Sequence, residues 1–266
     1  MMSPGDHFNL GGKVALITGG SKGIGKNIAM DLAQAGAKVV IVSRHLAEGR
    51  QVAQAIEKSY GPAMALYADI SRIDTLSPMV EAATEAMGKI DILINNAGTN
   101  IRKPALDFSE DEWDTVLNTN LKGTFFCSQV VAKTMANTGG GKIINISSAA
   151  GGNAVPWLTP YSISKAGIIH LTRALAIEWA RYNITVNAIA PSYMETPLTR
   201  EWLSDPKRRN LIAKRSPLNR VGQPTDLSGA LLLFASDDSN FITGQTLFVD
   251  GGSGAGWVIQ WDEIES

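Results

Sequence analysis

A tyrosine and a lysine four positions apart offer acid–base chemistry. Tyr161 and Lys165 stand in the segment Tyr-Ser-Ile-Ser-Lys, and within a helix this spacing places both side chains on one face. A tyrosine holds its proton too tightly to act as a base near neutral pH. A neighbouring ammonium favours the phenolate, so we expect Lys165 to lower the pKa of Tyr161. The same spacing also occurs in surface pairs of amphipathic helices, so its meaning depends on the rest of the chain.

A glycine-rich turn near the N-terminus predicts a phosphate-binding loop. Residues 18–25 read Thr-Gly-Gly-Ser-Lys-Gly-Ile-Gly and directly follow the apolar run 14–17. The glycines permit positive φ and let a ligand approach the backbone without meeting a Cβ. The helix that opens after them offers unpaired N–H groups and positive potential to a pyrophosphate. Glycines also make ordinary turns, but the strand before and the helix after favour a nucleotide site. Its candidate contacts are Gly19, Ser21, Lys22, Gly23, Ile24 and Gly25.

Short apolar runs alternate with helical patterns along most of the chain, and these are the elements that must position such residues. Strands are expected at 14–17, 38–42, 63–67, 90–94, 142–146, 185–190 and 246–249. Helices are expected between them, among others at 27–35, 76–87, 113–135, 161–182 and 227–236. Fully apolar strands alternating with helices indicate a parallel sheet that is covered on both faces. The expected fold is therefore α/β, a Rossmann-like, doubly wound, seven-stranded parallel sheet.

One segment, 192–225, interrupts this alternation. It is rich in charge and proline and precedes the last helix and strand. A plain surface insertion is one interpretation. Because the carboxyl ends of the strands point toward it, we expect a mobile lid over a site. No linker or repeat divides the chain, so residues 1–266 are expected to form a single dinucleotide-binding and catalytic domain, with a C-terminal tail at 254–266.

Composition excludes several other classes of protein. With 24 Lys+Arg against 25 Asp+Glu, the 266 residues carry a net charge of −1, so the broad positive field of a nucleic-acid-binding protein is missing. The single Cys127 excludes a disulfide within the chain, and His7, His45 and His170 are scattered, so no metal site is expected. No apolar run reaches the ~18–20 residues of a membrane span and no signal peptide is visible. We expect a cytoplasmic protein without a membrane partner.

The order of the motifs resembles that of the short-chain dehydrogenase/reductase family, in its compact single-domain branch. The match spans roughly residues 10–252 and rests on Gly-x-x-x-Gly-x-Gly at 19–25, Asn-Asn-Ala-Gly at 95–98, Asn120, Ser148 and Tyr-x-x-x-Lys at 161–165. The resemblance implies an NAD(P)-dependent oxidoreductase. It would transfer a hydride reversibly between a secondary alcohol or ketone and the pro-S face of a nicotinamide.

The same resemblance gives roles to four residues. Tyr161 would exchange the hydroxyl proton, its pKa lowered by Lys165 and by the charge of an oxidised nicotinamide. Ser148, thirteen positions before Tyr161, would hydrogen-bond the reacting oxygen, and the family spacing favours it over its neighbour Ser147. Lys165 would also hold the nicotinamide ribose. Asn120 would hold a water in a proton relay, although a capping amide is the alternative.

The adenosine end of the cofactor site favours NADP(H) over NAD(H). The strand 38–42 leads into Ser43 and Arg44, without the acidic residue that binds the ribose hydroxyls of NAD. Arg44 and Lys22 could pair with a 2′-phosphate, although solvated surface cations are the alternative, and NAD(H) stays open. Ser192 stands where the family commonly has glycine. Further cofactor contacts implied by the resemblance are Asp69, Ile70, Asn96, Ala97, Gly98, Tyr161, Lys165, Pro191, Ser192, Met194 and Thr196.

On the substrate side, residues 98–105, 192–196 and 204–206 are similar to the gluconate 5-dehydrogenase subgroup. That similarity implies a sugar acid such as gluconate or 5-ketogluconate, with Ser148 at its reacting oxygen. Arg102 could pair with the carboxylate, or it could lie on a subunit surface. The aromatic candidates for pocket walls, which could equally pack the lid, are Trp157, Tyr193 and Trp202.

Two other functions remain open from the residues alone. One is a 3-oxoacyl-thioester reductase or a broad-specificity carbonyl reductase. The other is a nucleotide-binding sensor or scaffold without turnover, because a fold does not determine a function. Helices around 105–135 and 161–182 resemble those that build tetramers in the family, so a homotetramer is implied. Cys127 is expected to be packed rather than catalytic, and the tail with Trp257 and Trp261 is either frayed or anchored at an interface.

Overall fold

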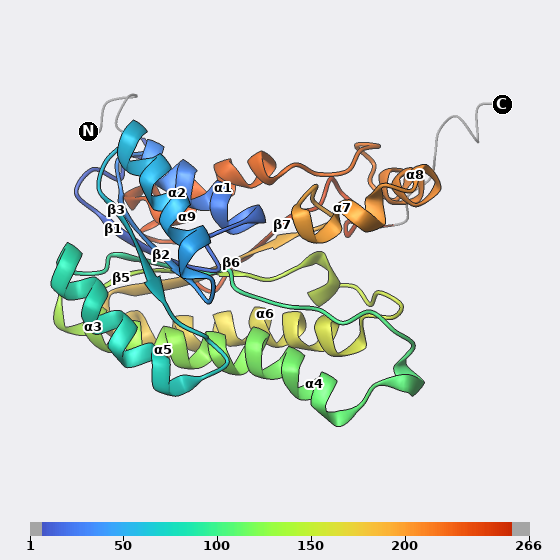
Figure 1. Ribbon diagram of the computed structural model, residues 1–266, viewed down its shortest axis with the longest axis horizontal. Coiled ribbons are helices and arrows are strands. Elements are labelled where there is room, and N and C mark those ends of the chain that lie inside the picture. The colour runs from blue at the N-terminus through green and yellow to red at the C-terminus, as the bar shows by residue number, and fades with distance from the viewer. Residues whose placement is uncertain (1–6, 257–266) are drawn as a thin grey trace.

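The computed structural model describes residues 7–256, in which seven parallel strands form one sheet (Figure 1). The strands are β1 (Val14–Thr18), β2 (Lys38–Ser43), β3 (Ala63–Tyr67), β4 (Ile92–Asn95), β5 (Gly141–Ile146), β6 (Ile184–Pro191) and β7 (Thr246–Val249). Their order is β3-β2-β1-β4-β5-β6-β7. The order reverses direction between β1 and β4, which makes the sheet doubly wound and confirms the expected fold.

Helices cover both faces of this sheet. They are α1 (Gly23–Gln34), α2 (Leu46–Ser59), α3 (Leu76–Met87), α4 (Glu110–Leu117), α5 (Gly123–Asn137), α6 (Thr159–Trp179), α7 (Pro197–Leu203), α8 (Pro206–Lys214) and α9 (Ser228–Ala235). Figure 1 shows α1, α2 and α9 on one face and α3, α5 and α6 on the other. Alternate residues of one strand enter the two layers: Ile17 packs under α1, and Leu16 packs on the opposite side. Burial on both faces is why the strands read as continuous apolar runs.

The helical pattern at 113–135 resolves into two helices rather than one. Between α4 and α5 the turn Asn118–Lys122 is π-helical. Asn120 in this turn is 1% exposed, and its amide bonds both backbone groups of Thr99. A π-turn shifts the residues after it around the helix axis, and here it directs a polar side chain toward the end of β4.

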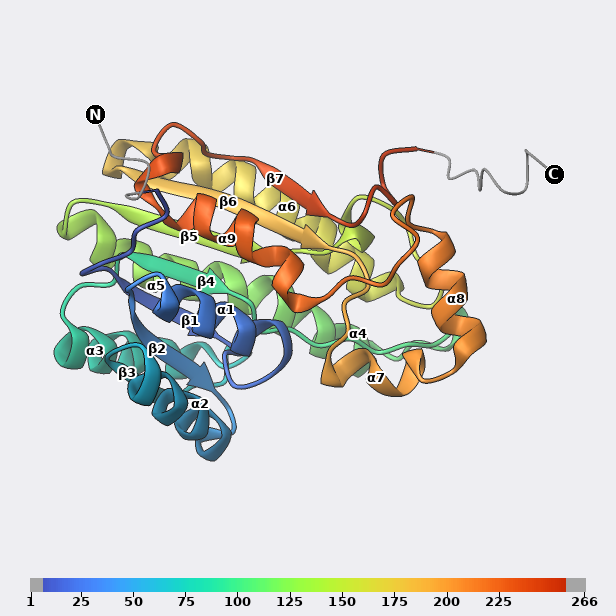
Figure 2. The same cartoon turned by 90° about the horizontal axis from the view of Figure 1, so that it is seen from above.

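Both lid helices, α7 and α8, lie beyond the carboxyl ends of the strands (Figure 2). They have a small apolar cluster of their own, made of Leu203, Ile212 and Val221 with Tyr193 and Trp202. The lid is thus a packed unit at the expected edge of the sheet. Trp257 and Trp261 of the tail lie outside the described residues. Within residues 7–256 no helix is long and apolar enough to span a membrane.

Candidate active site

A cleft of about 1290 Å³ opens at the carboxyl edge of the sheet, between the strand ends and the lid. Every residue that the sequence predicts to bind cofactor or substrate, or to act in catalysis, lines this cleft except Asn120 and Trp157. The residues predicted from separated motifs are therefore brought to one place. Among the described residues, no group of three or more His, Cys, Asp or Glu side chains could hold a metal ion.

The glycine loop leaves the start of α1 accessible from the cleft. Gly19 and Gly23 have φ of 65° and 56°, a conformation that favours glycine. A Cβ on Gly25 would lie 2.2 Å from the Gly19 carbonyl oxygen and 2.4 Å from Asn96 Nδ2, so only glycine fits there. Lys22, the N-cap of α1, gives its helix no side-chain cap. The first N–H groups of α1 thus remain available to an anion, and the loop fits a pyrophosphate.

Asn96 has a structural part in this loop that the sequence did not indicate. Its Nδ2 donates to the carbonyl oxygens of Thr18 and Gly19, both at 3.0 Å. The Thr18 hydroxyl in turn accepts from the backbone N–H groups of Asn96 and Ala97. The segment after β4 is therefore bonded to the phosphate loop after β1, and the two keep a fixed separation.

The adenosine end of the cleft presents a cation and no carboxylate directly at the end of β2. Arg44 is exposed, and its guanidinium lies 4.0 Å from Asp69 Oδ2. Asp69 Oδ1 accepts from the backbone and the hydroxyl of Ser71. Ser43 is buried and donates to Ser21 Oγ at 3.1 Å. This donor set fits a phosphorylated ribose. His45, which was not predicted to bind a cofactor, also lines the cleft.

Tyr161 and Lys165 emerge from the first turns of α6 beside β5. Lys165 is 5% exposed, its Nζ donates to the carbonyl of Ile146 at 2.8 Å, and it lies 5.7 Å from the centre of the Tyr161 ring. Burial lowers the pKa of Lys165 to about 8. Burial also raises the pKa of Tyr161, against the opposing effect of its hydrogen bond with Ser148.

Without the positive charge of an oxidised nicotinamide, the pKa of Tyr161 is therefore raised rather than lowered. Both groups leave water when the site forms, and loss of hydration disfavours whichever form of each group is charged. For a phenol that effect raises the pKa, and for an ammonium it lowers the pKa. Desolvation is the largest cause of both shifts.

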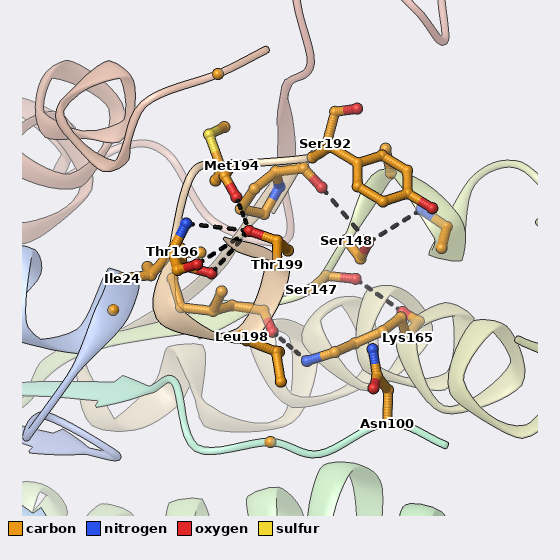
Figure 3. A pocket seen from close by; sticks show the side chains of 18 of the residues that line it. Ile24, Asn100, Ser147, Ser148, Lys165, Ser192, Met194, Thr196, Leu198 and Thr199 are labelled. Atoms are coloured by element: carbon orange, nitrogen blue, oxygen red, sulfur yellow. Dashed lines mark hydrogen bonds between the residues drawn. The ribbon is translucent and has the colours of Figure 1, made fainter. Parts of the chain in front are cut away.

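The two neighbouring serines face different surroundings, as Figure 3 shows. Ser147 is buried and donates to the backbone carbonyl of Lys165 at 2.8 Å, which fastens α6 to β5. Ser148 Oγ accepts from the backbone N–H of Ala150 at 3.1 Å. Its other contacts are a long hydrogen bond of 3.4 Å to the Pro191 carbonyl and the hydrogen bond with Tyr161. Of the two hydroxyls, that of Ser148 is the freer to bind a reacting oxygen.

Asn120 does not line the cleft but lies directly behind it. Its Oδ1 accepts from the Thr99 N–H, and its Nδ2 donates to the Thr99 carbonyl and to Ser164 Oγ. A Cβ built on Gly98 would be 3.2 Å from Asn120 Oδ1 and 3.6 Å from Lys165 Nζ. Asn120 thus braces the chain segment beside Lys165.

Three predicted substrate residues form one cluster, in which Arg102 contacts two aromatic residues of the segment 192–225. Arg102 donates to the Tyr193 hydroxyl at 2.9 Å and lies 5.0 Å above the Trp202 ring. Tyr193 and Trp202 are stacked, with ring centres 5.4 Å apart. The prediction that Trp157 lines the pocket is wrong. Its backbone φ is 66°, it does not line the cleft, and it is 56% exposed.

Thr199 was not predicted, although it shapes the wall of the cleft beside Met194 and Thr196. Its hydroxyl donates to the Met194 carbonyl at 2.6 Å and accepts from the Thr196 N–H at 3.0 Å. Together Thr196 and Thr199 make a capping box at the start of α7, with Pro197 in its first turn. Two threonines three positions apart beside a proline are a helix-start signal that could have located this turn.

Comparisons with known proteins agree with this geometry. A family model described as "Enoyl-(Acyl carrier protein) reductase" matches residues 19–254. A 2-dehydro-3-deoxy-D-gluconate 5-dehydrogenase of Dickeya dadantii is 44% identical over 92% of this chain and 96% of that protein. A gluconate 5-dehydrogenase of Gluconobacter oxydans is 40% identical over 94% of this chain and 98% of that protein.

Among solved structures, a gluconate 5-dehydrogenase from Burkholderia cenocepacia in complex with NADP and tartrate superimposes with a TM-score of 0.92. It is 38% identical, and the match covers 95% of this chain and 99% of that chain. The family model, the sequence relatives and the solved structure thus each match most of this chain. This chain belongs to the short-chain dehydrogenase/reductase family of NAD(P)-dependent oxidoreductases that act on CH–OH groups.

Proposed function

We propose that this enzyme interconverts the secondary alcohol and the ketone of a sugar acid, of the gluconate and 5-ketogluconate class, with NADP(H) preferred to NAD(H). One observation carries the proposal. The cleft holds Ser148, Tyr161 and Lys165 together with a guanidinium, that of Arg102, which Tyr193 presents. A guanidinium in this position suits the carboxylate of a small acid. The names of the sugar-acid dehydrogenases among the relatives support the same substrate class.

The cofactor site is made of three groups of residues. The glycine loop and the start of α1 would bind the pyrophosphate. Ser21, Lys22, Ser43 and Arg44 would face the phosphorylated ribose, and Lys165 would hold the nicotinamide ribose. When bound, the nicotinamide supplies or accepts the hydride.

The protein side chains would handle the proton and the oxygen of the substrate. Tyr161 exchanges a proton with that oxygen, and Ser148 donates a hydrogen bond to it as its charge changes. Lys165 adds positive charge beside the phenol. Asn120 holds Thr99 and Ser164, and through them the walls on either side of Lys165.

Initial rates with NADPH and NADH test this proposal. The substrates are 5-ketogluconate, a 3-oxoacyl thioester and an uncharged cyclic ketone. We expect the sugar acid to be reduced fastest, and Tyr161→Phe to lower kcat by about 10²–10⁴-fold. Arg102→Ala should raise KM for the sugar acid alone, whereas the exposed Arg200→Ala should not. Preference for the thioester, or cofactor binding without turnover of any substrate, would contradict the proposal.

We also propose that the single-domain chain assembles into a homotetramer in the cytoplasm. Large apolar side chains stay exposed on α6 and before α4, with Ile177 81% and Leu106 99% exposed, which suits contact with further copies.

The only cysteine, Cys127, is buried and reduced, as a reducing compartment allows. Light scattering should give four times the chain mass of 28.4 kDa, and Ile177→Glu should lower it. A monomeric wild-type protein would contradict the assembly.

A further inference from the structure

A second, smaller depression of about 230 Å³ adjoins the adenosine end of the cleft. It shares Ser21 and Lys22 with the cleft and is further lined by Lys26 and by Glu48. Glu48 lies in the first turn of α2, which begins shortly after β2 ends at Ser43. An exposed carboxylate thus stands next to the residues that face the phosphorylated ribose in the proposed function.

A chain of hydrogen bonds connects Glu48 to the cleft. The His45 backbone N–H donates to Ser43 Oγ at 3.1 Å, and Ser43 Oγ donates to Ser21 Oγ at 3.1 Å. Ser21 Oγ then donates to Glu48 Oε2 at 3.3 Å. All the donors run in one direction and end on the carboxylate. The hydroxyl hydrogen of Ser21 is therefore directed at Glu48 and away from the cleft.

We propose that Glu48 is a specificity-determining residue, which restrains the preference for NADP(H) over NAD(H) by weakening the binding of the phosphorylated cofactor. This inference rests on the proposed cofactor site. A 2′-phosphate brings roughly two negative charges at neutral pH close to the Glu48 carboxylate. It also gains the hydrogen bond of Ser21 only when Ser21 leaves Glu48. A free ribose hydroxyl is uncharged and can donate to Ser21 while Ser21 keeps its bond to Glu48.

The cations at this end do not cancel the effect of Glu48. Arg44 already has Asp69 Oδ2 at 4.0 Å, and its exposed side chain is hydrated. Lys22 and Lys26 share the small depression with Glu48. The phosphate would thus meet three cations and two carboxylates, Asp69 and Glu48. Removal of one carboxylate strengthens phosphate binding and leaves the binding of an unphosphorylated ribose nearly unchanged.

Equilibrium binding without substrate tests the inference. Titration of wild type and Glu48→Gln with NADPH and NADH, followed by cofactor fluorescence, gives the dissociation constants. For solvent-exposed charges a few ångströms apart, we expect NADPH to bind about 3- to 10-fold more tightly to Glu48→Gln and NADH to change by less than about twofold. The gain should shrink at 1 M salt, where the Debye length is only about 3 Å.

Two controls separate charge from structure. Glu57→Gln removes the same charge from the far end of α2 and should leave both dissociation constants unchanged. Adenosine 2′,5′-bisphosphate and 5′-AMP differ only in the 2′-phosphate. Glu48→Gln should therefore change the dissociation constant of the first and leave that of the second unchanged. The NADH titration reports at the same time whether the variant is folded.

Equal changes for NADPH and NADH, or no change for NADPH, would overturn the inference. A protein that binds neither cofactor would overturn both the inference and the proposed cofactor site. A protein that responds to Glu48→Gln as expected but does not turn over a sugar acid would keep this inference and contradict the proposed substrate.

Discussion

Replacement of Lys165 by methionine should stabilise the ligand-free protein near neutral pH, although it removes a residue of the proposed active site. Lys165 is 5% exposed, and burial lowers its pKa from 10.5 to about 8. At ~1.4 kcal/mol per pH unit, holding the ammonium in the folded protein costs about 3 kcal/mol. Methionine fills a similar volume without charge. It leaves the Ile146 carbonyl without its 2.8 Å donor, which costs about 1–2 kcal/mol. The free energy of unfolding of Lys165→Met at pH 7 should therefore exceed that of wild type by about 1–2 kcal/mol.

The sign of this difference should change with pH. Between pH 8 and 10.5 the unfolded wild-type chain keeps its Lys165 proton while the folded chain loses it, so wild-type stability rises with pH. The variant has no such group and lacks this contribution. The excess stability of Lys165→Met over wild type therefore decreases above pH 8. Near pH 10.5 the lost hydrogen bond makes the variant less stable than wild type.

Urea unfolding of both proteins at pH 7, 8, 9 and 10, at one fixed protein concentration, measures the difference in the free energy of unfolding. The exposed Lys133→Met on α5 is the matched control and should show no comparable pH-dependent difference from wild type. If Lys165→Met is less stable than wild type at pH 7, or if the difference does not vary with pH, the desolvation argument fails.

Three further substitutions test separate parts of the site. Gly25→Ala places a Cβ 2.2 Å from a backbone carbonyl of the phosphate loop, so thermal unfolding should show a loss of about 1–3 kcal/mol, and titration should show weaker NADPH binding. Ser148→Ala should lower kcat on the order of 10²-fold with little change in thermal stability, whereas Ser147→Ala should act mainly on stability. Ser164 Oγ bonds both Asn120 and the Tyr161 carbonyl, while Ser162 Oγ is buried without a partner. Ser164→Ala should therefore lower kcat and shift its pH profile, and Ser162→Ala should leave both unchanged.

The strands could be predicted from the sequence because their burial leaves a direct pattern. The runs at 63–67 and 246–249 coincide with β3 and β7, and the other strands differ from their predicted bounds by one or two residues. The helix α2 lies between two predicted strands, where a helix was expected, although its bounds were not predicted. Its buried residues Gly49, Val52, Ala53 and Ile56 recur at helical spacing, so the sequence could have located it. The lid helices α7 and α8 are short, and their signals are caps and prolines rather than periodicity.

The cleft residues could be predicted by type and spacing, but their contacts could not. Spacing distinguished Ser148 from Ser147 only through a resemblance, while the physical difference is a bond from Ser147 to α6. The position of Asn120 depends on one π-turn, and that of Trp157 on one positive φ. Glu48 reaches Ser21 only because α2 begins shortly after β2. Such features depend on backbone geometry that residue types alone do not specify.

Burial of the catalytic pair also determines which proton transfer the protein's own groups favour. With a pKa of about 8, Lys165 keeps its proton in roughly nine of ten molecules at pH 7. Tyr161, with its pKa raised by burial, keeps its proton as well. The side chains by themselves therefore present a proton donor to the substrate oxygen, as reduction of a ketone requires. Oxidation of an alcohol needs the phenolate, and burial alone disfavours the phenolate. The ligand-free site thus presents both side chains in their protonated forms at neutral pH, and formation of the phenolate requires either a higher pH or added positive charge in the cleft.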